Sequence, residues 1–210
     1  MLAYYYTWGK VSDKTHQFIA WLYFIAAWMS LFIITGIISF QLTPGKWIDT
    51  HSFWDGFLNP TFWPSVVGRT GIALLLAGIY AAFVVAFTKD QAVKAKAGRF
   101  TGYFIIIGAI LSFLGMYWWS YAIPEEVREQ FLGGNEILSG FYINSFKLLI
   151  ATTIIATVFT IILPKQMNVF IAALIFVLGF ASFGYYEFTR ERVRKPFVIR
   201  DYMYSNGILV

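Results

Sequence analysis

Five long apolar blocks are the feature of this sequence that most restricts its fold. They cover residues 18–42, 66–88, 101–123, 141–163 and 168–187. Each block holds roughly 20 residues, and an α-helix of that length crosses a hydrocarbon core of about 30 Å. A segment inside a bilayer must satisfy its backbone hydrogen bonds internally. The sequence therefore predicts an all-α integral membrane bundle of about five transmembrane helices, in a single domain over residues 1–210.

The composition agrees with a bilayer environment and excludes several kinds of site. Only 13% of the residues are charged, whereas soluble domains carry about 25%. The chain has no cysteine, which excludes disulfides, Cys-ligated iron–sulfur clusters and the CxxCH attachment of c-type haem. No P-loop, HExxH or dinucleotide-binding motif occurs. The net charge of +5 is expected to set the membrane topology, so no nucleic-acid partner is predicted.

The distribution of lysine and arginine predicts an orientation. Basic residues gather before the first block and in the second and fourth connecting loops, which share one side of the membrane. The positive-inside rule then places the N-terminus in the cytoplasm and the C-terminus in the periplasm, across a bacterial inner membrane. The C-terminal tail, residues 188–210, is strongly basic and would lie outside. Pairing with the acidic third loop, or binding to an anionic partner, would explain that charge.

Histidine is a common axial ligand of membrane-bound haem, and the chain has two histidines. His16 stands at the cytoplasmic start of the first block, and His51 stands in the first outer loop. Neither lies inside a block, so the facing pair that bis-histidine haem needs is absent. Haem is therefore not expected on this chain alone. His16 is more simply an interface residue, whereas His51 could also reach a quinol or the haem of a partner subunit.

Ionisable residues within or beside the blocks are the best candidates for a site, because charge is costly in lipid. The candidates are Arg69, Lys147, Glu187, Glu191, Arg194 and Lys195. Glu187 and Glu191 are one helical turn apart and share a face. One interpretation is an ion-pair network that closes the outer end of the bundle. The other is a polar pocket where a quinol loses its protons to a carboxylate, while a cation stabilises the developing anion.

Three segments, taken in order, resemble one membrane family. Residues 16–45 contain an HxxxxW pattern and end in Pro-Gly; residues 52–70 contain Ser-Phe, Asn-Pro and Arg-Thr pairs; residues 191–197 read ERVRKPF. Together they resemble subunit I of cytochrome bd quinol oxidase, whose corresponding third segment reads ExGRQPW. The Ser-Phe-Lys run at 145–147 is similar to an SFR run of that family. The resemblance implies a membrane subunit with quinol oxidation at the outer side.

The sequence departs from that family at its haem ligands. The match begins at the family's fourth helix, so the histidine that binds the oxygen-reducing haem has no counterpart. Arg69 replaces a ligating histidine, Leu149 a ligating methionine and Gly184 a ligating glutamate, with Glu187 one turn further on. Arginine has no free lone pair with which to bind iron. The resemblance therefore implies a subunit that is not an oxygen reductase by itself, with any haem supplied by partner subunits.

Two functions follow. The first is a membrane subunit of a respiratory electron-transfer complex, which anchors the complex and helps form an outer-side quinol-oxidation site. Its partners would be other membrane subunits and a periplasmic c-type or multihaem cytochrome. Glu187 and Glu191 would transfer protons, while the quinol would bind at Arg69, Lys147, Arg194, Lys195 and His51. The alternative is a haem-free structural anchor that touches no quinone. A transporter is disfavoured, because the blocks show neither internal symmetry nor paired broken helices.

Overall fold

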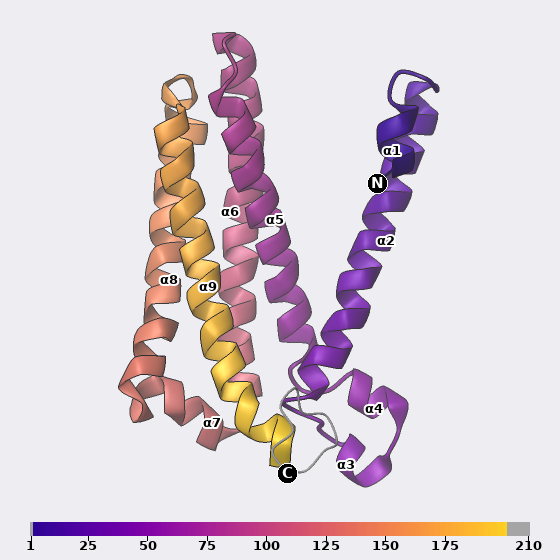
Figure 1. Ribbon diagram of the computed structural model, residues 1–210, viewed down its shortest axis with the longest axis vertical. Helices are drawn as coiled ribbons and strands as arrows, with labels where there is room; N and C mark the ends of the chain where they lie inside the picture. The colour runs from indigo at the N-terminus through magenta and orange to yellow at the C-terminus, as the bar shows by residue number, and fades with distance from the viewer. Residues whose placement is uncertain (1, 201–210) are drawn as a thin grey trace.

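The computed structural model describes the backbone from residue 2 to residue 200 and the side chains as far as residue 193. This part of the chain is helical and contains no strand. The elements are α1 (Leu2–Thr7), α2 (Asp13–Phe40), α3 (Trp47–Thr50), α4 (Phe53–Phe57), α5 (Phe62–Ala86), α6 (Gln91–Ala122), α7 (Glu125–Glu129), η1 (Gln130–Gly134), α8 (Glu136–Thr157), η2 (Val158–Ile162), η3 (Pro164–Gln166) and α9 (Val169–Arg200). Figure 1 shows their arrangement.

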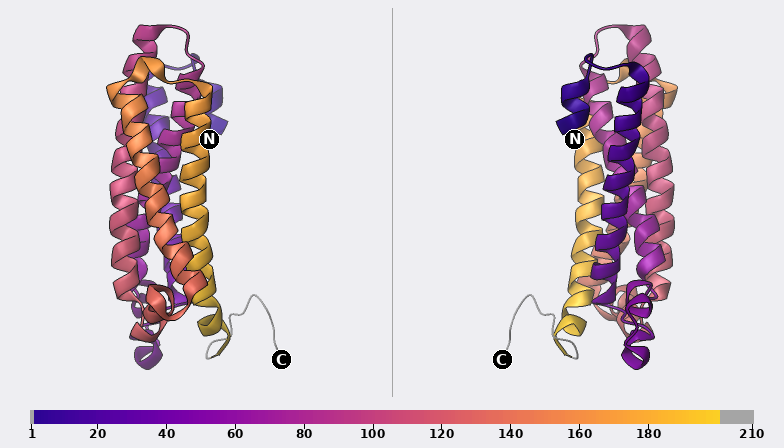
Figure 2. Two further views of the ribbon diagram at one scale, coloured as in Figure 1. Left: turned by 90° about the vertical axis from the view of Figure 1, so that its left-hand side faces the viewer. Right: turned by 90° about the vertical axis from the view of Figure 1, so that its right-hand side faces the viewer.

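Five helices within the described residues are long and apolar enough to cross a membrane: α2, α5, α6, α8 together with η2, and α9. The prediction of an all-α, five-helix membrane bundle is confirmed, and the chain is a multi-pass membrane protein. Figure 2 shows the helices running nearly parallel to the long axis. The short helices α3, α4 and α7 gather at one end, called here the α7 end, opposite the end that carries α1.

Polar caps decide where several helices begin. The Asp90 side chain accepts hydrogen bonds from the backbone N–H groups of Ala92 and Val93, at 2.7 and 3.1 Å. The Asn135 side chain accepts one from Leu138, at 3.1 Å. Such caps satisfy the N–H groups that the first turn of a helix leaves without partners. As a result, α6 and α8 begin 10 and 5 residues before the apolar blocks at 101 and 141.

The last helix also differs from the expected boundary. The sequence predicts a helix that ends at residue 187 and a separate basic tail from 188, but α9 continues as helix to Arg200. Glu187 and Arg190 form an ion pair three residues apart across the expected boundary. Pairs at this spacing stabilise a helix. The first part of the basic segment is therefore a helical extension of the bundle, and residues 201–210 lie outside the described chain.

The centre of the bundle consists of α5, α6, α8 and α9. Helices α5 and α6 pack most closely, because glycines face each other across the contact, Gly71 near Gly108 and Gly68 near Gly115. Small residues allow membrane helices to approach until their backbones touch. Helices α8 and α9 are joined by a hydrogen bond from the Ser182 hydroxyl to the Ser145 carbonyl, at 2.8 Å. The buried side chains between the four helices include Leu75, Ile79, Ile105, Leu149 and Ile175.

Lys94 secures the end of the bundle opposite α7. Its side chain is buried, and its Nζ donates to the carbonyl oxygens of Ala86 and Met167 at 3.3 and 3.1 Å. Ala86 is the last residue of α5, and Met167 precedes α9. Carbonyl groups at a helix C-terminus carry partial negative charge and attract a cation. One lysine thus ties α6 to the end of α5 and to the loop before α9.

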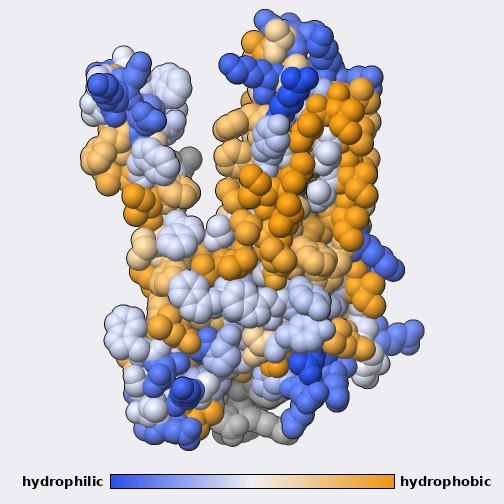
Figure 3. Space-filling view, turned by 180° about the vertical axis from the view of Figure 1, so that it is seen from behind, coloured by the Kyte–Doolittle hydropathy of each residue, from blue (hydrophilic) through white to orange (hydrophobic). Residues whose placement is uncertain are grey.

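Helix α2 diverges from the other four. Only 6% of its most apolar window is buried, against 44% in α5 and in α6. Figure 1 shows α2 meeting the bundle near the α7 end and leaving it toward the other end, so that the two parts form a V. In the space-filling view of Figure 3 a deep notch separates them. The ring of Phe32 contacts Phe57 and Phe62 where α2 does meet the bundle.

Candidate functional site

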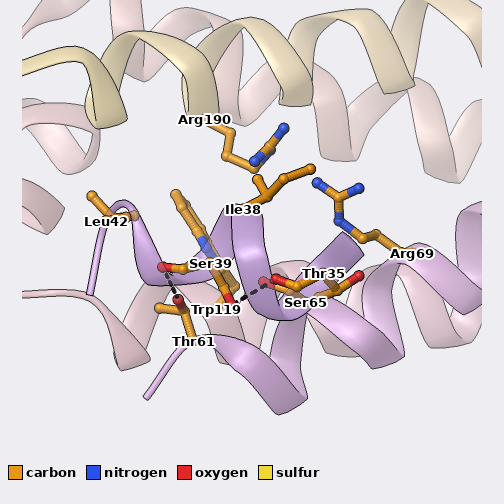
Figure 4. Close-up of a pocket in the computed structure, with 9 residues that line it drawn as sticks. All are labelled: Thr35, Ile38, Ser39, Leu42, Thr61, Ser65, Arg69, Trp119 and Arg190. Atoms are coloured by element: carbon orange, nitrogen blue, oxygen red, sulfur yellow. Dashed lines mark hydrogen bonds between the residues drawn. The ribbon is translucent and has the colours of Figure 1, made fainter. Parts of the chain in front are cut away.

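A small polar cavity lies where α2 meets the bundle. Its walls come from four helices that are distant in sequence, and they combine hydroxyl groups, two arginines and one tryptophan. The lining residues are Thr35, Ile38, Ser39 and Leu42 of α2; Ser65 and Arg69 of α5, with Thr61 just before that helix; Trp119 of α6; and Arg190 of α9. Figure 4 shows these side chains converging from the separate helices. The cavity therefore lies at the junction of α2 with α5, α6 and α9.

A network of buried polar groups holds α2 in place beside the cavity. The Asn59 amide donates to the Ser39 hydroxyl at 2.8 Å and to the Gly56 carbonyl at 3.0 Å. Its carbonyl oxygen accepts from the hydroxyls of Thr43 and Thr61, each at 3.1 Å. Buried polar groups are costly unless they are paired. Asn59 therefore fixes the end of α2, the loop after it and the start of α5 in one arrangement.

Arg190 and Arg69 bring two positive charges to the same cavity. The Arg190 guanidinium pairs with the Glu187 carboxylate, and its Nε lies 3.0 Å from Oε2. The two side chains are 15% and 28% exposed, so solvent screens the pair only partly. Arg69 reaches the cavity from α5, and in Figure 4 its guanidinium points toward that of Arg190, with Ile38 beside them. Two guanidinium groups favour an anionic or hydrogen-bond-accepting ligand.

The predicted site residues are only partly brought together. Arg69 lines the cavity. Glu187 does not line it but forms an ion pair with Arg190, which does. Glu191 lies one turn beyond Glu187 on α9 and is half-buried. These three predicted residues therefore belong to one region at the α7 end.

Other predicted residues lie elsewhere or outside the description. Lys147 is exposed on α8, about three turns from the start of that helix, and does not line the cavity. His51 ends α3 in a left-handed conformation with φ of 51°, and its ring contacts Trp47 edge-on. It is exposed and does not line the cavity either. Arg194 and Lys195 fall among the residues whose side chains are not described.

Several lining residues were not among the sequence candidates. Arg190 had a usable signal, because it follows Glu187 by three residues, the spacing of a helical ion pair. Ser65 precedes Arg69 by one turn, so the two share a face of α5. Trp119 is 2% exposed, and nothing in its sequence context distinguishes it from the neighbouring aromatic residues at the end of α6.

The size of the cavity limits what it can hold as it stands. Its volume is about 10 Å³, close to the smallest space that accepts one water molecule. A larger ligand would need α2 to move away from α5 and α9. That movement would have to loosen the contacts near the α7 end, where the Asn59 network and Phe32 hold α2 against the bundle. Within the described residues, no group of three or more His, Asp or Glu side chains could hold a metal ion.

Comparisons with known proteins identify no relative of this chain. No family model matches the chain, and no curated protein or solved structure matches it significantly. The resemblance to subunit I of cytochrome bd quinol oxidase therefore stays a prediction, based on the segments that carry it.

Proposed function

We propose that this protein is a membrane subunit of an electron-transfer complex and that it binds a quinol at the α7 end. The observation that carries this proposal is the convergence of Arg69 and Arg190 on one hydroxyl-lined cavity, with the Glu187 carboxylate beside them. Arg69 lies seven residues into α5, about 10 Å along the helix. This depth, just inside the expected membrane surface, would suit a quinol head group, which is polar but attached to an apolar chain.

The residues of the cavity suit the chemistry of quinol oxidation. Oxidation of a quinol to a quinone releases two electrons and two protons. Arg69 and Arg190 would stabilise the anion that forms when the first proton leaves, since guanidinium groups bind oxygen anions strongly. Glu187 would accept one proton when it exchanges its ion pair with Arg190 for a hydrogen bond to the quinol hydroxyl. Glu191, one turn further along α9, would accept the second proton. The electrons would pass to a haem on a partner subunit, for which a periplasmic c-type cytochrome is the natural candidate.

The proposal includes an orientation. The basic residues near α1 and in the α5–α6 connection would face the cytoplasm, and the α7 end would face the periplasm of a bacterial inner membrane. The chain has no cysteine, so single cysteines can be introduced and labelled from one side. In sealed inside-out vesicles, Lys96→Cys should react with an impermeant maleimide, and Asp55→Cys should not. The opposite pattern would place the α7 end in the cytoplasm.

Glu187→Gln and Arg69→Gln test the quinol site directly. Quinol turnover per assembled complex should fall about tenfold or more for each, as removal of a positioned catalytic group does. Glu125→Gln is the matched control, because Glu125 forms an ion pair with Arg128 at the same i,i+3 spacing but is exposed. Its turnover should be unchanged. If Glu187→Gln lowers the amount of complex but leaves turnover per complex intact, the chain is a structural anchor and the proposed site is wrong.

A visible difference spectrum, reduced minus oxidised, tests the assignment of haem to partner subunits. The chain purified alone should show no haem bands, whereas the complete complex should show them. A b-type spectrum from the chain alone would contradict the proposal, and His16 and His51 would then need to be examined as ligands.

A further inference from the structure

The notch between α2 and α5 has two contrasting walls. The last hydrogen bond between the two helices runs from the Trp28 indole Nε1 to the Thr70 hydroxyl, at 3.3 Å. Beyond it α2 and α5 separate (Figure 1), and the notch is open in the space-filling view (Figure 3). On α2, Phe24 and Trp21 precede Trp28 by four and seven residues and continue its face. On α5, Ala73 and Ala77 follow Thr70 by three and seven residues and continue the opposing face.

These four residues define the wedge: Trp21 and Phe24 on one wall, Ala73 and Ala77 on the other. All four are exposed, the aromatic residues by 57% and 54%. Trp21 and Phe24 contact each other edge-to-face, with ring centroids 5.7 Å apart. The wedge is therefore apolar on both sides, with large side chains opposite small ones, and it is open to the hydrocarbon of the bilayer.

The narrow end of the wedge is directed toward the polar cavity that Arg69 and Arg190 line. Thr70, which closes the wedge, is next to Arg69, which lines the cavity. The apolar space thus ends at Thr70, and the cavity lined by Arg69, Arg190 and several hydroxyls lies beyond that contact. An apolar wedge followed by a polar cavity is complementary to an amphiphile with an oxygen-bearing head and one long apolar chain. It does not match a partner helix, because a helix is about 10 Å across and cannot reach the narrow end where the polar groups are.

We infer that the wedge holds the isoprenoid chain of the quinol and is the route by which the quinol enters from the bilayer. The inference rests on the proposed quinol function, and it adds where the chain lies and how the head group arrives. Entry requires the Trp28–Thr70 contact to open, so that the head group passes between α2 and α5 to Arg69 and Arg190. The isoprenoid chain then remains against Trp21, Phe24, Ala73 and Ala77.

The energetics define which measurement is informative. Lipid tails are as apolar as the walls of the wedge, so the chain gains little by leaving the bilayer. Removing a favourable contact with the chain would therefore change affinity only slightly. Filling the wedge is a stronger perturbation, because a chain that no longer fits would pull the head group out of the cavity. Ala77→Phe adds a ring to the small wall, and a misfit of this kind weakens binding about tenfold.

The test uses the full chain in lipid nanodiscs and two quinones with the same head group. One carries a long isoprenoid chain, and the other carries a single isoprene unit. Ala77→Phe should raise the Kd of the long-chain quinone about tenfold and leave that of the short-chain quinone unchanged. Ile107→Phe is the control, because Ile107 is exposed to lipid on α6 and lies outside the wedge. It should change neither value.

A long-chain quinone with a photoreactive group at the end of its chain locates the chain directly. Cross-links should map to α2 around Trp21 and to α5 around Ala77. Cross-links to a second lipid-facing groove, between Phe113 of α6 and Ile150 of α8, would overturn the inference. So would an equal effect of Ala77→Phe on both quinones.

The outcomes separate this inference from the proposed function. If Arg69→Gln weakens the binding of both quinones but Ala77→Phe affects neither, the quinol site stands and the wedge is not its entrance. If neither quinone binds, the proposed function itself fails. If Ala77→Phe instead removes a co-purifying phospholipid while quinone binding is unchanged, the occupant is a structural lipid and the inference is wrong.

Discussion

Replacing Gly108 by alanine should separate the two most closely packed helices of the bundle. A Cβ atom at this position would overlap the backbone nitrogen of Leu75, lie 2.7 Å from the Leu75 Cα, and lie 2.8 Å from the carbonyl oxygen of Gly71. Unbonded carbon atoms prefer a separation of about 3.5–4.0 Å. These neighbours are backbone atoms, which no rotamer change can move. Helices α5 and α6 must therefore shift apart by about 1 Å.

The magnitude follows from two opposing effects. Overpacking of this kind costs about 1–3 kcal/mol, and the upper part of that range applies where backbone meets backbone. The higher helix propensity of alanine offsets part of this loss, because alanine is more favourable than glycine within a helix by about 0.8–1 kcal/mol. The net expectation is a loss of about 2 kcal/mol in the free energy of unfolding. Gly184→Ala is the control, since a Cβ there meets nothing within 4 Å, and it should be stabilising by about 0.5–1 kcal/mol.

Reversible unfolding in mixed detergent micelles, followed by circular dichroism during a titration with dodecyl sulfate, measures both variants. The two should differ by about 3 kcal/mol. If Gly108→Ala is as stable as Gly184→Ala, the contact between α5 and α6 is not as close as described, and the reasoning from the glycine pairs fails.

Three further changes can be measured in the same titration. Lys94→Met leaves helix-end carbonyls without a donor and should cost about 1–3 kcal/mol, whereas Lys96→Met, at an exposed position, should be neutral; equal effects would show that burial of Lys94 is not what matters. Asn59→Ala removes the centre of a buried polar network and should lower the free energy of unfolding by about 2–3 kcal/mol. The control Asn144→Ala, at an exposed position, should be close to wild type. A loss below about 0.5 kcal/mol for Asn59→Ala would contradict the network. Asp90→Ala removes the cap of α6 and should cost about 1 kcal/mol, while Asp90→Asn should retain most of it.

The sequence predicted the number of transmembrane helices because the bilayer restricts the choices so strongly. It predicted their ends less well, since the polar first turns of α6 and α8 extend beyond the hydrocarbon and carry no apolar signal. The caps were nevertheless visible: Asp90 and Asn135 are residues that typically precede a helix. The continuation of α9 beyond residue 187 had a signal as well, in the spacing of Glu187 and Arg190.

The arrangement of the helices could not be predicted from the same patterns. In a bilayer every face of a helix can be apolar, so periodicity does not reveal which face is buried. The most apolar stretch of α2 has a mean hydropathy of 2.0 and that of α5 has 1.8, yet α2 is mostly exposed and α5 is central. For this reason the charge of Arg69 made it a candidate, but its convergence with Arg190 and Trp119 on one cavity depends on packing that the sequence pattern does not show. Lys147 is the opposite case: its charge made it a candidate site residue, but the structure places it on an exposed face away from the cavity.

The divergence of α2 has a consequence for the surrounding membrane. Its apolar part, residues 18–40, extends over about 35 Å, more than the hydrocarbon thickness of about 30 Å, and helices accommodate such an excess by tilting. Because α2 packs against the bundle near one end only, few contacts oppose a change in its tilt. We therefore expect a thinner membrane to tilt α2 further from α5 and a thicker one to bring the two helices together.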